Sequence, residues 1–163
     1  MAAPTRGEHP WPRTAGRGFT LIELVVAVAV LGVLAAVAMP LAQVTATRAR
    51  EMELRRDLRQ IRGGLDQFKA EYDKARANAT DARQEFRKLI SVDRTGYPLT
   101  LDEMVQLKIL RRIPRDPMTE DGKWVTRSFS DNPESSLSDG RDVFDVSSAS
   151  KMTALDGTHY DTW

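Results

Sequence analysis

The stretch GFTLIELVVAVAVLGVLAAVAMP, residues 18–40, decides the fold of this chain. Its 20 residues from Phe19 to Ala38 span about 30 Å as an α-helix, which is the thickness of the hydrocarbon core of a bilayer. One charged residue, Glu23, interrupts the apolar run, and an ionised carboxylate inside a membrane costs about 3 kcal/mol unless it has a partner. The stretch therefore predicts a transmembrane helix with one carboxylate that needs a partner.

Two kinds of group are able to pair with Glu23. One is a Lys or Arg of another chain, and the other is a free amino terminus. Cleavage after Gly18 would make Phe19 the first residue and would place its ammonium about one helical turn from Glu23. Between staggered neighbouring chains the two charges can form a close ion pair in a low dielectric. The Pro-, Gly- and Arg-rich residues 1–18 have no helical period, so we expect them not to fold.

The run Gly18-Phe19-Thr20-Leu21-Ile22-Glu23 after a basic leader resembles the signal of the type IV pilin and pseudopilin superfamily. The resemblance implies that a prepilin peptidase removes residues 1–18 by cutting between Gly18 and Phe19 and methylates the new Phe19 amine. It also implies that Glu23 serves filament assembly. Gly32 and Pro40 fall where the helix of this superfamily is often interrupted, and Pro40 predicts a kink near the membrane exit.

An ordinary secretory signal is the alternative, with Ala36-Val37-Ala38 as its cleavage motif. That interpretation leaves Glu23 unexplained inside the apolar region. A lipoprotein is excluded because the sequence contains no Cys. Arg6, Arg13 and Arg17 precede the apolar run and favour a cytoplasmic amino terminus. We therefore expect a single-pass protein of the bacterial inner membrane with its remaining residues in the periplasm.

A second apolar pattern shows that the helix continues over residues 41–75, outside the membrane. Apolar residues recur there with spacing 4, 3, 4, 3, 4, which predicts one buried stripe. The stripe consists of Leu54, Leu58, Ile61, Leu65, Phe68 and Tyr72. Gly63-Gly64 predicts a bend or a close approach to a sheet. The Arg-rich residues 48–62 lack interleaved aromatic residues, so a solvated face or one that pairs with neighbouring subunits, through Arg55 and Arg56, is favoured over nucleic-acid binding.

The remaining residues, 76–163, predict a small globular periplasmic domain. We expect a short helix over 81–90, a helix over 101–109 that begins with a Thr100–Glu103 capping box, and strands over 124–129 and 143–146. A Ser-, Asp- and Gly-rich loop, residues 130–141, joins the strands. The predicted fold class is α+β: a long pilin-like helix, 19–40 in the membrane and 41–75 beyond it, packed on a small antiparallel sheet with long loops.

The globular half resembles the major pseudopilin of type II secretion systems, on Gly96-Tyr97-Pro98, Ile113-Pro114-Arg115-Asp116-Pro117 and Phe144-Asp145-Val146-Ser147-Ser148. The resemblance implies a subunit that polymerises into a periplasmic pseudopilus and drives export of folded proteins across the outer membrane. It implies as partners other copies of the chain, minor pseudopilins, the prepilin peptidase, membrane lipid, and an inner-membrane assembly platform with its cytoplasmic ATPase. A type IV pilin of a surface filament for adhesion, motility or DNA uptake is the alternative.

The same resemblance implies calcium in the last loop, where Asp156 and Asp161 are the oxygen donors present and Asp145 is a further candidate. Packing of Tyr160 and Trp163 is the alternative way to fix that loop. With two His, no Cys and a net charge of +1, the chain offers no catalytic set and no bulk attraction for polyanions. We therefore expect no enzyme, with an unrelated membrane-anchored periplasmic enzyme as the remaining alternative.

Overall fold

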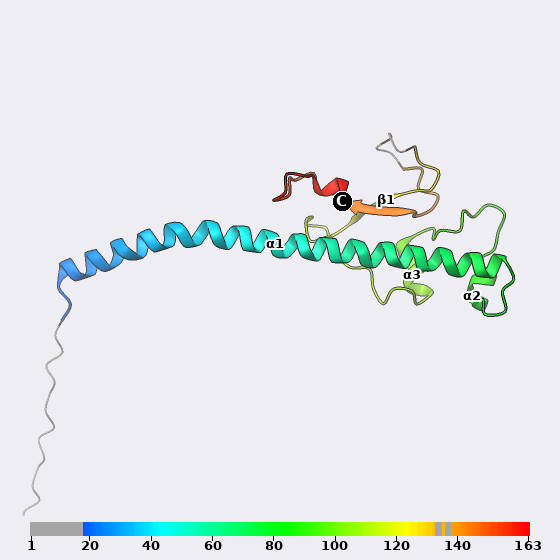
Figure 1. Ribbon diagram of the computed structural model, residues 1–163, viewed down its shortest axis with the longest axis horizontal. Helices are drawn as coiled ribbons and strands as arrows, with labels where there is room; N and C mark the ends of the chain where they lie inside the picture. Colours follow the sequence, from blue (N-terminus) through cyan, green and yellow to red (C-terminus); the bar gives the residue numbers. More distant parts are fainter. Residues whose placement is uncertain (1–17, 133–134, 136–137) are drawn as a thin grey trace, which may run out of the picture. The chain divides into compact units, whose positions relative to one another are not determined.

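A computed structural model describes residues 18–132, 135 and 138–163 (Figure 1). The predicted leader is residues 1–18, and all of it except Gly18 lies outside the described residues. The chain divides into two compact units, Met1–Ala42 and Gln43–Trp163, and each is described by itself. The elements in chain order are α1 (Leu21–Arg76), α2 (Gln84–Arg87), α3 (Leu101–Gln106), β1 (Trp124–Arg127), β2 (Asp145–Ser148) and the 3-10 helix η1 (Tyr160–Thr162).

The described part of the first unit is the start of α1, preceded by three non-helical residues, 18–20. Its apolar side chains are exposed, from Leu21 at 82% to Leu41 at 67%. The helix is long and apolar enough to cross a membrane, and no residue of its apolar window is buried. The helix predicted from the 18–40 stretch is therefore confirmed, and its exposed surface is the one that needs lipid or other subunits around it.

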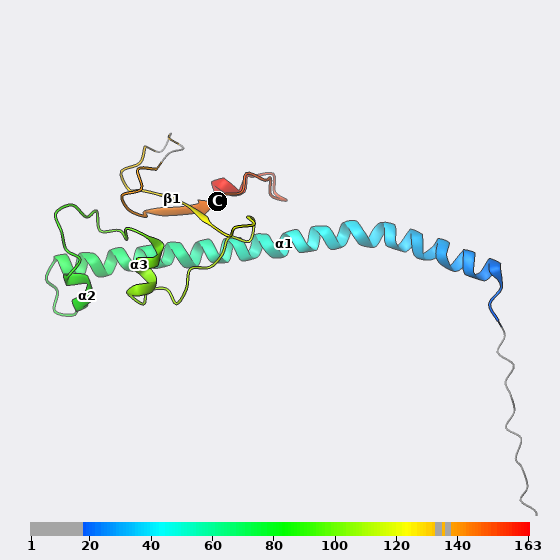
Figure 2. The ribbon, with the colours of Figure 1, turned by 180° about the vertical axis from the view of Figure 1, so that it is seen from behind.

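In the second unit, the remainder of α1 buries the predicted apolar stripe. Leu54, Ile61 and Phe68 are completely buried, and the stripe ends in Tyr72 at 1% exposure. The residues that cover it come from every later element and include Phe86, Met104, Leu110, Val143, Val146, Ala154 and Tyr160. Figures 1 and 2 show the strands and the last residues running along this part of α1, with α2 near its end. The stripe thus forms the spine of the core.

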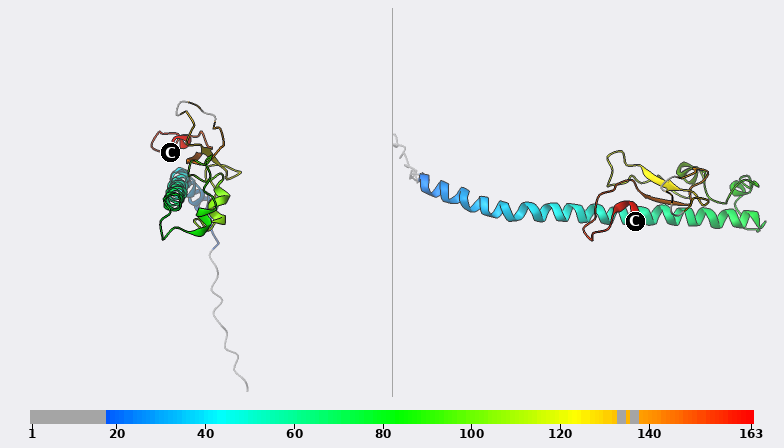
Figure 3. Two further views of the ribbon diagram at one scale, coloured as in Figure 1. Left: turned by 90° about the vertical axis from the view of Figure 1, so that its right-hand side faces the viewer. Right: turned by 90° about the horizontal axis from the view of Figure 1, so that it is seen from above.

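Gly64 allows a close approach to α1, but the approaching element differs from the predicted sheet. A Cβ added at Gly64 would lie 3.2 Å from the Leu110 side chain and 3.6 Å from Ile109, whereas one added at Gly63 would meet nothing within 4 Å. The segment after α3, and not the sheet, makes this approach. Figure 3 shows the second unit from the end and from above.

The two strands form an antiparallel pair, as predicted, with Trp124 opposite Ser148 and Arg127 opposite Asp145. Their bounds differ from the prediction. β1 ends at Arg127 because the next two backbone N–H groups, of Ser128 and Phe129, donate to the carboxylates of Asp131 and Asp142 instead of to a strand.

The second strand lies two residues later than the predicted 143–146. The Val143 N–H donates to the Pro98 carbonyl at 2.8 Å, which ties this residue to the turn before α3. Val146 and Ser148 are buried while Asp145 and Ser147 are half-buried, the alternation of a strand with one covered face.

The two short helices are shorter than predicted. α2 occupies four residues within the predicted 81–90. α3 begins at Leu101 as expected but ends at Gln106, because Lys108 has a φ of 58° and the N–H groups of Ile109 and Leu110 both turn back to the Met104 carbonyl. The predicted capping box is wrong: the Glu103 carboxylate accepts from the Leu99 N–H at 2.8 Å and pairs with Arg94 at 2.7 Å.

Candidate processing and assembly segments

The predicted cleavage site lies directly before the first helix. Gly18 and Phe19 are in non-helical backbone, and Phe19 is 91% exposed. The bond between them therefore lies outside the helix in an exposed stretch of backbone. Methylation would act on the Phe19 amine that cleavage creates. Cleavage and N-methylation here stay predictions.

Glu23 forms a reciprocal pair with Thr20 at the start of α1. Its Oε2 accepts from the Thr20 backbone N–H at 2.9 Å and from the Thr20 hydroxyl at 3.0 Å, while the Glu23 N–H donates to Thr20 Oγ1 at 3.3 Å. This is a capping box, in which two unpaired helix donors are satisfied. Its T-x-x-E signature stands in the sequence, and our sequence reasoning missed it because Glu23 was considered only as an unpaired charge.

The capping box also fixes where the Glu23 charge points. Because Oε2 contacts the backbone of Thr20, the carboxylate turns toward the amino-terminal end of the helix, next to the residue that follows Phe19. The helix dipole stabilises a negative charge at this position. Glu23 is therefore held close to the atom that cleavage would turn into an ammonium.

Gly32 and Pro40 both lie inside the assigned helix α1. A side chain at Gly32 would meet nothing within 4 Å. The helix is assigned without a break through both residues, and a kink at Pro40 stays a prediction.

The two predicted calcium ligands lie at different places. The Asp156 carboxylate accepts from Arg55 at 2.9 Å and from the Thr158 hydroxyl and N–H at 2.6 and 3.0 Å. The Thr158 hydrogen bonds, with help from Arg55, hold the pKa of Asp156 below its ordinary value. Asp161, in η1, instead lines a cavity of about 440 Å³ together with Arg62 and Arg127.

The third candidate, Asp145, also faces a cation, because its carboxylate accepts from Arg62 Nε at 2.7 Å. Over residues 18–132, 135 and 138–163, no three His, Asp or Glu side chains are grouped so as to hold a metal ion. Calcium needs six to eight oxygens, so backbone carbonyls would have to complete its shell around these carboxylates. Calcium at Asp156 and Asp161 itself stays an untested prediction.

The contact of Arg55 and Arg56 with neighbouring subunits stays a prediction. Within its own chain, Arg55 bonds Asp156, and its guanidinium lies 4.0 Å from the centre of the Trp163 ring. Arg56, the next residue, lies on a different face of the helix and lines an open cavity of about 810 Å³ with Arg112 and Arg115. Arg55 thus has an acidic partner in its own chain, whereas Arg56 faces an open cavity.

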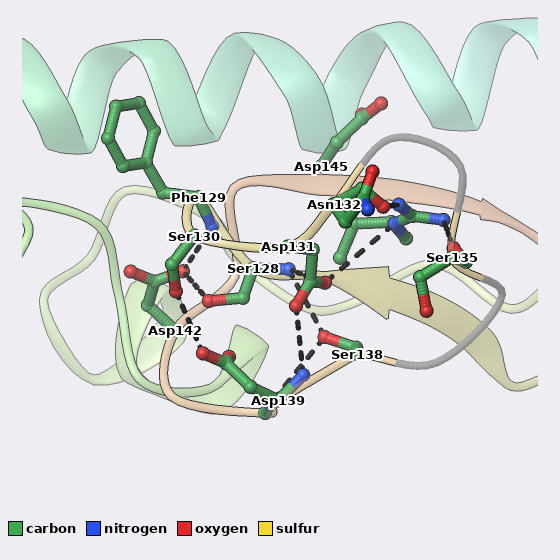
Figure 4. Close-up of polar contacts among 12 residues, drawn as sticks. Ser128, Phe129, Ser130, Asp131, Asn132, Ser135, Ser138, Asp139, Asp142 and Asp145 are labelled. Atoms are coloured by element: carbon green, nitrogen blue, oxygen red, sulfur yellow. Dashed lines mark hydrogen bonds and ion pairs between the residues drawn. The ribbon is translucent and has the colours of Figure 1, made fainter.

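Sequence reasoning missed a network of aspartates among the described residues that follow β1 (Figure 4). Asp142 is buried, and its Oδ1 accepts from the Ser128 hydroxyl at 2.8 Å and the Phe129 N–H at 2.9 Å. Asp131 accepts from the N–H groups of Ser128 and Asp139 at 2.7 and 2.9 Å. These bonds satisfy the carboxylates with protein donors. The Asp- and Ser-rich composition of 128–142 is the only sequence signal for them.

Comparison with known proteins identifies the amino-terminal segment. Residues 13–39 match the family described as the prokaryotic N-terminal methylation motif. The match covers the cleavage site, the capping box and most of the apolar helix. The motif and the helix are those of a membrane-anchored pilin or pseudopilin.

The second comparison extends the relationship into the globular unit. The chain is 31% identical over 110 residues to the type II secretion system core protein G of Klebsiella pneumoniae, and the alignment covers 64% of this chain and 71% of that protein. No solved structure matches. The alignment covers more of the chain than residues 1–76, so it includes residues beyond the end of α1. The chain therefore belongs to the family of the type II secretion system core protein G, the major pseudopilins.

Proposed function

We propose that this chain polymerises into the periplasmic pseudopilus of a type II secretion system and that growth of this filament drives folded proteins across the outer membrane. The observation that carries the proposal is the 31% identity to a type II secretion core protein over 71% of that protein. The function is mechanical: the subunit works by binding its copies, and it needs no chemistry of its own.

The exposed apolar start of α1 supports polymerisation. Its large side chains, from Phe19 to Leu41, are between 53% and 91% exposed. Burial of apolar area contributes about 25 cal/mol per Å², so removing this surface from water is strongly favourable. Before assembly, membrane lipid covers it; in the filament, the same helices of other copies do. Polymerisation thus exchanges lipid contacts for contacts between helices.

The capping box supports a role for Glu23 in two stages. In the precursor, Thr20 satisfies the carboxylate within its own chain. After cleavage, the Phe19 ammonium of a neighbouring copy offers a stronger, charged partner in a low dielectric. The N–H and hydroxyl of Thr20 hold the carboxylate in position until that partner arrives. Cleavage after Gly18 would therefore be required before the subunits can assemble.

Topology and partners follow from the same proposal. The basic residues before the apolar run favour an amino terminus in the cytoplasm, where a prepilin peptidase would cut, with residues 43–163 in the periplasm. The assembly platform of the inner membrane, with its cytoplasmic ATPase, would extract the subunits from lipid, and minor pseudopilins would share the filament.

Two experiments test the proposal. Mass spectrometry of the mature protein should find Phe19 first and N-methylated, whereas an amino terminus near Leu41 would indicate ordinary secretion. Deletion of the gene should abolish export of folded proteins, and a plasmid copy should restore it. If deletion instead removes long surface filaments and leaves export intact, the protein is a type IV pilin and the secretion function is wrong.

A further inference from the structure

Three half-buried or exposed side chains of α1 form hydrogen bonds or ion pairs with the 149–163 segment. They are Glu51, Arg55 and Arg62, which we call the α1 clamp. Their spacing of four and seven residues places them along one face of the helix. Each side chain of the clamp contacts a different part of the segment, more than 80 residues away in the sequence.

Glu51 holds the middle of the segment. Its Oε1 accepts from the Leu155 N–H at 2.8 Å and from the Tyr160 hydroxyl at 3.0 Å. Tyr160 is 1% exposed, so its hydroxyl needs a partner inside the protein, and the carboxylate supplies it. Burial, with the Glu51 hydrogen bond, raises the pKa of Tyr160. This contact anchors both sides of the turn at Gly157.

Arg55 closes the turn from the outside. It pairs with Asp156 at 2.9 Å, and its guanidinium stacks on the Trp163 ring at 4.0 Å. Trp163 in turn packs edge-on against Tyr160, with 5.2 Å between the ring centres, and donates its indole N–H to Thr158 at 2.6 Å. One cation thereby links two points of the segment that lie seven residues apart.

Arg62 joins the segment to the sheet. Its guanidinium donates to the Asp145 carboxylate at 2.7 Å, to the Val146 carbonyl at 2.9 Å and to the Trp163 carbonyl at 2.6 Å. The planar fork of an arginine suits such divergent acceptors, which the point charge of a lysine would not reach together. A carboxylate and two carbonyls converging on one positive charge is also the donor chemistry of a calcium site.

We propose that Arg55 and Arg62 take the place of a calcium ion in this chain, so that the 149–163 segment is fixed without any divalent cation. The carboxylates of Asp145 and Asp156 each contact a guanidinium, which supplies the positive charge that a metal would bring. A calcium ion at either carboxylate would have to displace that arginine and leave it beside a second cation. This inference concerns the subunit alone and holds whichever filament the protein forms.

Hydrogen exchange of the full-length protein in detergent tests the proposal. Peptides from 149–163 are compared in millimolar calcium and in chelator, for the wild type and for Arg55→Gln, Arg62→Gln and Arg59→Gln. Arg59 is exposed on the same helix and is the matched control. We expect wild-type exchange to be unchanged by calcium, and Arg55→Gln and Arg62→Gln to exchange about tenfold faster in both buffers because a charge-assisted contact is lost. Arg59→Gln should behave as the wild type.

Two results would overturn the proposal. Slower exchange of the wild-type segment in calcium than in chelator would show that a metal fixes it. Unchanged exchange in both Arg55→Gln and Arg62→Gln would show that the clamp contributes nothing. If Arg62→Gln fails to fold, Arg55→Gln decides, because the Arg55–Asp156 pair is about half exposed and its loss leaves the core intact.

Discussion

Thr20 and Glu23 bond each other in both directions across the first turn of α1. We expect Glu23→Ala to insert into the membrane normally but to form few filaments, because the charge that pairs with a neighbour is gone. Thr20→Val removes the cap hydroxyl, which costs about 1 kcal/mol, and should give an intermediate yield. Thr20→Ser keeps the hydroxyl and is the control. Filaments sheared from cells and subunit in membranes are compared by immunoblot; a normal yield from Glu23→Ala would refute the role.

The neighbouring arginines Arg55 and Arg56 should respond differently to charge reversal. Arg55→Glu would place a carboxylate against Asp156 and one turn from Glu51, so we expect the melting temperature to fall by about 4 °C. Arg56→Glu changes only an exposed cavity wall, so it should melt as the wild type while it lowers the filament yield. Calorimetry and pelleting separate the two effects. Equal melting temperatures for the two variants would contradict the stabilising role given to the Arg55–Asp156 pair.

Alanine at the two adjacent glycines should have opposite effects. Gly63 has open space, so Gly63→Ala should stabilise the protein by about 1 kcal/mol through helix propensity. Gly64 lies against Leu110 in the core, so Gly64→Ala should destabilise it by roughly 1 kcal/mol, since overpacking outweighs the propensity gain. Urea unfolding measures both changes. A stabilised Gly64→Ala would mean that Leu110 moves aside at little cost.

Acid should destabilise the globular unit through its hydrogen-bonded aspartates. Hydrogen bonds to neighbouring hydroxyl and N–H groups lower the pKa of Asp131, Asp139 and Asp156 below the ordinary value of 3.8. As the pH falls, the unfolded chain binds protons before the folded one does. Their stabilisation is therefore complete above about pH 5 and is lost as the pH falls through 3.8 toward the lower folded values. Melting temperatures between pH 7 and pH 3 should show this decline.

Substitution of Asp156 measures how much of this acid sensitivity comes from its carboxylate. Asp156→Asn cannot titrate, so its melting temperature should depend less steeply on pH below 5 than that of the wild type. Asp93→Asn, in an exposed loop, is the matched control and should keep the wild-type slope. Parallel curves for Asp156→Asn and the wild type would contradict the role given to Asp156.

The features that the sequence predicts best are those with a local, periodic cause. The run from Phe19 to Ala38 and the stripe from Leu54 to Tyr72 repeat within one helix, and both agree with the structure. The end of β1 could not be predicted the same way. Ser128 and Phe129 directly follow a stretch with strand propensity. Their N–H groups, however, donate to the carboxylates of Asp131 and Asp142, and only folding brings these donors and acceptors together.

The α1 clamp is the clearest case of a site that sequence patterns cannot reveal. In the sequence, Arg55 belongs to an arginine-rich helix face, and Asp156 is an acid in a turn. The pair depends on how the last segment returns to α1 across 101 residues. The capping box of Glu23 differs, because its partner lies three residues away and its signature could have been read.

The long loops closed by the α1 clamp determine the order in which the domain can fold. Glu51 cannot form its hydrogen bonds until Leu155 and Tyr160 are available, and these residues lie 104 and 109 positions later in the chain. Helix α1 can form at once from local hydrogen bonds, but its apolar stripe lacks its cover until the last segment has been synthesised. Such a high contact order slows closure. A nascent subunit therefore exposes its apolar stripe until Ala154 and Tyr160 are available, and during that interval a chaperone or a protease can bind the uncovered helix.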